Sequence, residues 1–141
     1  MKIPVSHGHL EATVREPPGR LRGGAVFCHP HPLHGGTMHT KAVYRAAQAL
    51  TEVGLRTVRF NFRGVGVSTG TFEDGFGEED DVRAALDWLA QGLGGLPIIL
   101  GGLSFGSMVG LGVGVNDGRV LGMVALGAPI HTYDYSYLAR T

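Results

Sequence analysis

Short apolar runs that alternate with helix-like segments are the feature that most limits what this chain can fold into. Each run is short enough for a buried strand, and the segments between them place apolar residues at helical spacing. The expected strands span residues 24–28, 55–62, 97–100 and 120–126. The expected helices span residues 38–53, a segment from Glu78 onward, and residues after Ser104 to about 115. The apolar face expected for the second helix comprises Val82, Ala85, Leu86 and Leu89. Strands that alternate with helices predict a parallel α/β sheet.

The amino end departs from this alternation. Residues 2–16 are predicted to form two short strands around Ser6-His7-Gly8, which gives the sheet an antiparallel start. Acidic residues 78–81 fit the start of a helix, where the helix dipole favours carboxylates, better than a metal site. We therefore expect one domain over residues 1–141, with a mostly parallel sheet and flanking helices.

Charge and composition exclude several classes of function. Twelve basic and twelve acidic residues balance, which argues against a nucleic-acid partner or a polybasic membrane role. The start of the chain lacks the apolar stretch of a secretory signal, and no run approaches the roughly 18 apolar residues of a membrane span. The single Cys28 cannot form an internal disulfide. Together these features predict a cytoplasmic protein.

The stretch "LPIILGGLSFGSMVG", residues 96–110, places Ser104 between Gly102 and Gly106. With 24 glycines in the chain, the Gly-x-Ser-x-Gly pattern alone is weak evidence, and an ordinary glycine-rich turn is the alternative. The context strengthens it, because a strand precedes the serine and a helix follows. A nucleophile elbow needs this arrangement, with small neighbours that let the helix pass close to the strand.

Four stretches in order along the chain resemble the α/β-hydrolase superfamily, in particular its small dienelactone-hydrolase-like members and a related group of predicted hydrolases. The stretches are "VFCHPHPLHGGTM", "FNFRGVGVSTG", "GGLSFGS" and "GAPIHTYDYSYL". The resemblance implies that Ser104 is a nucleophile and that the Phe105 N–H stabilises the oxyanion. The second oxyanion donor would come from "HPHPLHGG", whose prolines have no N–H. His31 is the best candidate there, with Leu33 or Gly35 as alternatives.

The remaining motifs give no cofactor or metal. Histidines 29, 31, 34 and 39 could be read as metal ligands, but no carboxylate or cysteine is spaced with them in a zinc pattern, so we expect them to shape the pocket floor. "RGVGVSTG" does not fit the dinucleotide fingerprint. In the family this loop lines the site, and we expect Arg63 to pair with a buried partner.

The chain departs from the family after the elbow. The family order is serine, acid, histidine, and two more βα units of roughly 30 residues each would be needed to supply the last two. Asp134 could serve as the acid, but no histidine follows it, and His131 is the only histidine after Ser104. A triad of Ser104, His131 and Asp134 would need both partners on one short loop. We therefore expect a domain that lacks the last strands and helices of the family.

These observations lead to two hypotheses about function. The first is a serine esterase or other acyl hydrolase that acts on a small ester or acyl substrate, inactive or weak as this short chain. The second is a non-catalytic hydrolase-like module that binds a partner through an exposed sheet edge. Strand 120–126 is apolar and carries no Lys or Pro, so we expect it to pair with another copy of the chain in a homo-oligomer or with the segment that the family has after it, or else to make the chain poorly soluble.

Overall fold

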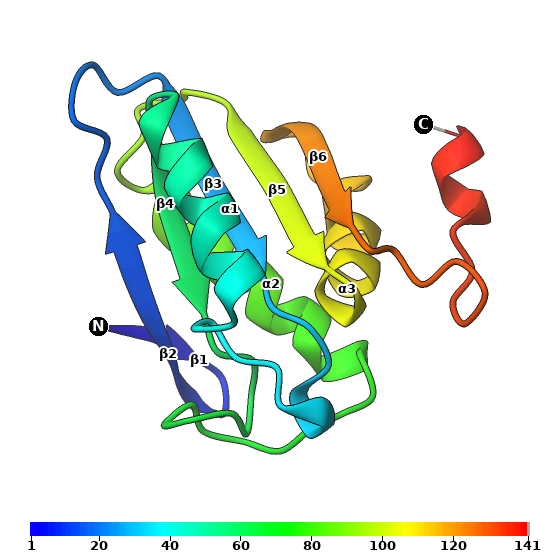
Figure 1. Cartoon of the computed structure of the whole chain (residues 1–141). Helices are drawn as coiled ribbons and strands as arrows, with labels where there is room; N and C mark the ends of the chain where they lie inside the picture. Colours follow the sequence, from blue (N-terminus) through cyan, green and yellow to red (C-terminus); the bar gives the residue numbers. More distant parts are fainter. Residues whose placement is uncertain (141) are drawn as a thin grey trace.

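Six strands form one mixed sheet with helices on both faces (Figure 1). The structure is a computed structural model and describes residues 1–140. The strands are β1 (Lys2–Val5), β2 (Gly8–Arg15), β3 (Gly23–Cys28), β4 (Leu55–Phe60), β5 (Ile98–Leu103) and β6 (Val120–Leu126). The helices are α1 (Lys41–Glu52), α2 (Phe76–Ala90) and α3 (Phe105–Gly114), with short 3₁₀ turns η1 (Pro32–His34) and η2 (Ser136–Arg140).

The strand order is β1-β2-β4-β3-β5-β6. Strands β1 and β2 are antiparallel to their neighbours, whereas β4, β3, β5 and β6 run parallel. The predicted parallel α/β sheet with an antiparallel start is confirmed. Because parallel strands end at the same edge, the loops after β3, β4 and β5 lie close together there.

Helix α1 lies on one face of the sheet, and α2 and α3 pack against each other on the opposite face (Figure 1). The apolar face predicted for α2 is buried, and it comprises Val82, Ala85, Leu86 and Leu89. No helix within residues 1–140 combines the length and the apolar character that crossing a bilayer requires.

Several expected boundaries were wrong, among them the end of β4, which is Phe60 rather than residue 62, and two of them differ by three residues. Helix α1 begins at Lys41 rather than residue 38, because residues 37–40 form a turn in which the Thr40 N–H donates to the Thr37 carbonyl. Strand β5 runs to Leu103 rather than residue 100, since Gly101 and Gly102 continue the pairing with β3. The longer strand brings Ser104 to the carboxyl edge of the sheet.

Candidate active site

Ser104 lies between the end of β5 and the start of α3, with φ of 54° and ψ of −117°. Side-chain-bearing residues rarely adopt this conformation, which costs on the order of 1–3 kcal/mol. Within residues 1–140, Asp74 is the one other non-glycine residue with positive φ. The strained turn predicted from the sequence is confirmed.

The two flanking glycines make this turn possible. A Cβ atom at Gly102 would collide with the backbone of Gly106, and one at Gly106 would collide with the carbonyl oxygens of Cys28 and His29. The first turn of α3 therefore packs directly on the end of β3. This close approach needs glycine at both positions.

Hydrogen bonds fix the backbone of the elbow on both sides. The Ser104 N–H donates to the Leu126 carbonyl at 2.9 Å, which ties the elbow to the end of β6. The Ser104 carbonyl accepts from the Ser107 hydroxyl at 2.6 Å and from the Met108 N–H at 3.2 Å. Phe105 is the first residue of α3, so its N–H has no acceptor within the helix. Within residues 1–140 no acceptor is recorded for that N–H, so it can donate to a ligand.

The histidine-rich loop after β3 lies beside the elbow. The ring of His31 is 5.0 Å from that of Phe105 and stacks on that of His34 at 4.2 Å, measured between centroids. The Leu33 N–H donates to Nδ1 of His31, so Leu33 is the weaker candidate for the second oxyanion donor. Within residues 1–140, no acceptor is recorded for the backbone N–H of His31.

His29 has a structural role in this loop. Its side chain is fully buried, Nε2 accepts from the Phe62 N–H at 3.0 Å, and Nδ1 donates to the Pro30 carbonyl at 2.7 Å. Burial lowers the pKa of His29 to about 4. Because both ring nitrogens are engaged, His29 is not available as a base or a ligand.

The part of the chain that the structure describes holds no group of three or more His, Cys, Asp or Glu side chains that could bind a metal ion. Nor does it record a hydrogen bond between the Ser104 hydroxyl and a histidine. Asp134, the candidate acid, accepts a hydrogen bond from the Ser136 N–H at 2.8 Å in its own loop. The structure therefore brings together Ser104, Phe105 and His31, and within residues 1–140 it records no hydrogen bond between Ser104 and His131.

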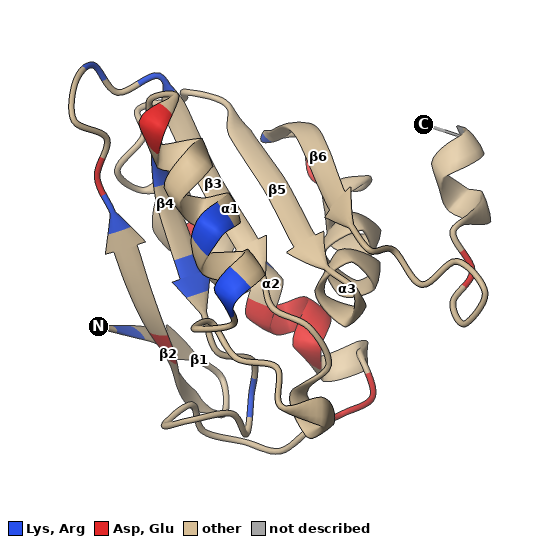
Figure 2. Ribbon diagram, viewed as in Figure 1, with Lys and Arg blue, Asp and Glu red and all other residues tan. Residues whose placement is uncertain are grey.

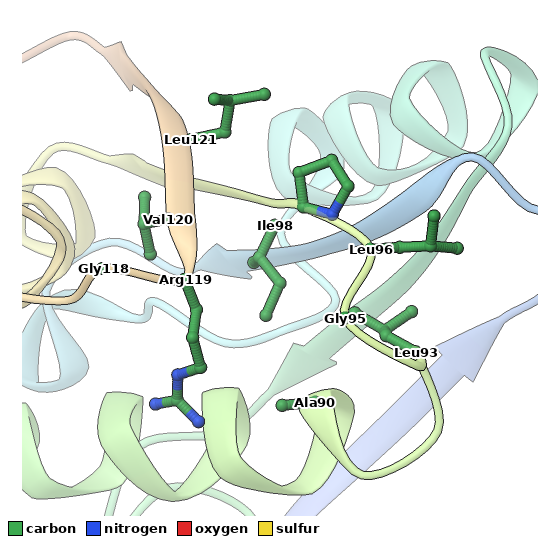
Figure 3. Close-up of a pocket in the computed structure, with 10 residues that line it drawn as sticks. Ala90, Leu93, Gly95, Leu96, Ile98, Gly118, Arg119, Val120 and Leu121 are labelled. Carbon is green, nitrogen blue, oxygen red and sulfur yellow. The ribbon is translucent and has the colours of Figure 1, made fainter.

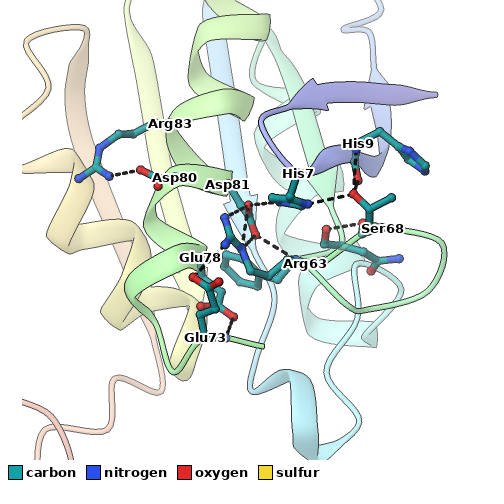
Figure 4. A network of polar contacts seen from close by, with 12 residues as sticks. His7, His9, Arg63, Ser68, Glu73, Glu78, Asp80, Asp81 and Arg83 are labelled. Atoms are coloured by element: carbon teal, nitrogen blue, oxygen red, sulfur yellow. Dashed lines mark hydrogen bonds and ion pairs between the residues drawn. The ribbon is translucent and has the colours of Figure 1, made fainter. Parts of the chain in front are cut away.

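A buried ionic network supports the loop after β4 (Figure 4). The Arg63 guanidinium pairs with the fully buried Asp81 at 2.8 Å and with Glu73 at 3.0 Å. Asp81 also accepts from the Arg63 backbone N–H and contacts His7 at 3.2 Å. The expected buried partner of Arg63 is confirmed. Its identity was missed, although Asp81 precedes the buried Ala85 by four residues and so lies on the core-facing side of α2.

A cavity of about 460 Å³ lies at the amino ends of β5 and β6, at the opposite end of these strands from Ser104 (Figure 3). Its lining is mainly apolar, and the Arg119 guanidinium beside it is already paired with Asp117 and Asp87. The cavity therefore has no part in the chemistry of the elbow.

Comparison with known proteins agrees with this geometry. The family model of the α/β hydrolase fold matches residues 33–139, and the chain belongs to this family. The structure of an α/β serine hydrolase homologue from Coxiella burnetii is 39% identical, with a TM-score of 0.89 over 99% of this chain and 65% of that one. A member of the α/β serine hydrolases without a lid from Xanthomonas campestris is 36% identical, with a TM-score of 0.91 over 96% of this chain and 63% of that one.

An uncharacterized protein of Rickettsia prowazekii is 42% identical over 120 residues, which cover 82% of this chain and 50% of that protein. The chain thus spans about two thirds of the length of these solved structures and half of the curated relative. Relative to the solved structures, its fold is a shortened α/β hydrolase.

Proposed function

We propose that the chain carries the nucleophile half of a serine acyl hydrolase that acts on a small ester. The observation that carries this proposal is the strained conformation of Ser104, held between two glycines at the carboxyl edge of a parallel sheet. A strained backbone conformation persists only where the surrounding structure holds it in place, and such residues cluster at active sites. The likeness to α/β serine hydrolases supports the same assignment.

In the reaction, Oγ of Ser104 attacks the acyl carbon and its proton passes to a base. The carbonyl oxygen becomes an oxyanion, and the N–H of Phe105 at the start of α3 is the first donor to it. We assign the second donor to the N–H of His31. The oxyanion then collapses to the acyl-serine as the base gives its proton to the departing alkoxide, which leaves as the alcohol. Water, deprotonated by the same base, attacks the acyl-serine, and the proton returns to Oγ of Ser104 as the acid is released.

The base is not supplied by His29, whose ring nitrogens are both engaged. A serine hydroxyl at its ordinary pKa is a poor nucleophile without a base. We therefore propose that the 141-residue chain hydrolyses activated esters weakly or not at all.

The test is the hydrolysis of p-nitrophenyl acetate by the wild type, Ser104→Ala and Ser6→Ala. Ser6 is an exposed serine in the β1–β2 turn and serves as the control. We expect slow turnover that falls to the background rate in Ser104→Ala and persists in Ser6→Ala. Turnover above the background rate that is the same in all three proteins would contradict the proposal. Rapid turnover that depends on Ser104 would instead show that this chain contains the base, with His31, His34 and His131 the residues to replace.

A further inference from the structure

Two arginines and one tyrosine meet on the α1 side of the sheet. Arg15 of β2 and Arg59 of β4 lie on the same sheet face, because Thr13 pairs with Arg59 and Arg15 is two residues further along β2. Both guanidinium carbons lie 5.2 Å from the centroid of the Tyr44 ring, which α1 places above them. We call these three side chains the Arg15–Arg59–Tyr44 cluster.

The positive charges of this cluster lack a counter-ion. Among residues 1–140, no ion pair is recorded for either arginine, whereas Arg56, Arg63, Arg83 and Arg119 are all paired with carboxylates. Burial and the neighbouring Arg15 charge lower the pKa of Arg59. Two like charges held side by side repel each other unless an anion lies between them.

Hydrogen bonds to uncharged oxygens satisfy only some of the N–H groups of the two guanidinium groups in the cluster. Arg59 donates through Nη1 to the Met38 carbonyl at 2.7 Å, and Nη2 of Arg15 lies 3.4 Å from the Tyr44 hydroxyl. Nη1 of Arg15 is buried and has no hydrogen-bond partner within the described residues. An unpaired buried donor is costly, which leaves the Arg15 guanidinium incompletely satisfied, and the exposed Nη2 is the part of it that a ligand can reach.

The acidic side chains near Arg15 in the sequence do not neutralise the cluster. Glu16, which follows Arg15, pairs with Arg56 at 2.7 Å. Glu11 instead accepts from the Asn61 side-chain amide at 2.8 Å and from the Val67 N–H at 3.1 Å. Figure 2 shows Lys and Arg along α1, on β4 and at the end of β2, with acidic positions at one end of α1 and on β2, whereas most Asp and Glu gather on α2 on the opposite face. The positive potential of the cluster is therefore reinforced by its surroundings although the chain has no net charge.

We propose that the Arg15–Arg59–Tyr44 cluster binds the phosphate group of a small phosphate monoester. Two guanidinium groups match a dianion, since a phosphate monoester carries about −1.5 to −2 charges at pH 7 and a carboxylate carries only one. The tyrosine hydroxyl, which contacts Arg15, can donate to a third oxygen. Strand β3 separates β4 from β5, so the site is distinct from the elbow at Ser104 and independent of the acyl chemistry.

The test follows the side-chain resonances of Arg15, Arg59 and Tyr44 by NMR while inorganic phosphate is added to the wild-type chain at constant ionic strength. We expect saturable shifts confined to these residues and their neighbours, and no saturation with acetate or chloride. Equal responses to phosphate and acetate, or phosphate shifts elsewhere in the molecule, would overturn the proposal.

Variants test the same site without relying on assignments. Arg15→Gln and Arg59→Gln are each expected to weaken phosphate binding about tenfold or more, as the loss of a charge-assisted hydrogen bond predicts. Arg45→Gln removes an equal charge from an exposed position on α1 and is the matched control. Equal weakening in all three variants would show that only the general positive potential matters and would contradict a built site.

Discussion

The replacement Asp81→Asn tests whether the buried network under the site stabilises the domain. The side chain keeps its size but loses the charge that faces Arg63, whose side chain is only 9% exposed. Removing one partner of a buried ion pair costs about 3–5 kcal/mol, because the other charge is left uncompensated. Arg63 keeps its contact with the half-exposed Glu73, so we expect the lower end, about 3 kcal/mol. This loss is a large fraction of the roughly 5–15 kcal/mol that stabilises a domain.

Urea denaturation followed by far-UV circular dichroism measures this loss. Asp80→Asn is the matched control, since Asp80 is adjacent, 72% exposed and paired with Arg83 on the helix surface. An exposed pair of this kind contributes about 1 kcal/mol or less. If the two variants unfold with free energies within about 0.5 kcal/mol of each other, the reasoning about the buried pair is wrong.

Three further outcomes are expected. Ser104→Gly should be more stable than Ser104→Ala by about 1 kcal/mol in urea unfolding, because only glycine adopts the elbow conformation without strain; equal stabilities would argue against strain. Burial lowers the pKa of His29 to about 4 in the folded chain. Below pH 6.5 this histidine is therefore protonated in the unfolded chain but stays neutral in the folded one, which lowers the stability of the fold. From pH 7 to pH 5 the wild type should lose about 2 kcal/mol more stability than His29→Asn. A matching pH dependence in both proteins would remove His29 as the cause. Within residues 1–140, strand β6 pairs with β5 alone, and Leu121 is 75% exposed. Light scattering should therefore detect self-association through this open edge. A monomer at high concentration would contradict pairing through this edge.

The sequence was sufficient for the features that depend on local pattern. The bounds of β6, residues 120–126, are those expected, and the apolar spacing of α2 identified its buried face. The turn at Ser104 was also predictable, because the turn needs glycine on both sides and Gly102 and Gly106 lie two residues before and after the serine. Periodicity and turn chemistry act over a few residues, which is why they can be read directly.

The contacts that depend on distant segments were not predictable in the same way. Arg63 was expected to have a buried partner, but the geometry that selects Asp81 arises only when α2 packs against the sheet. His29 was grouped with the other histidines of its loop, and its role became apparent only through the Phe62 N–H, 33 residues away. The approach of Arg15 and Arg59 to Tyr44 likewise requires β2, β4 and α1 to be assembled.

The most direct test of the central claim is covalent labelling of Ser104. A fluorophosphonate ester phosphonylates the activated serine of a hydrolase, and peptide mapping by mass spectrometry identifies the modified residue. We expect a single, slowly formed adduct on the peptide that contains Ser104, absent in Ser104→Ala and retained in Ser6→Ala. Prolonged incubation that leaves Ser104 unmodified, or that modifies Ser6 or Ser136 to the same extent, would contradict the assignment of Ser104 as the nucleophile.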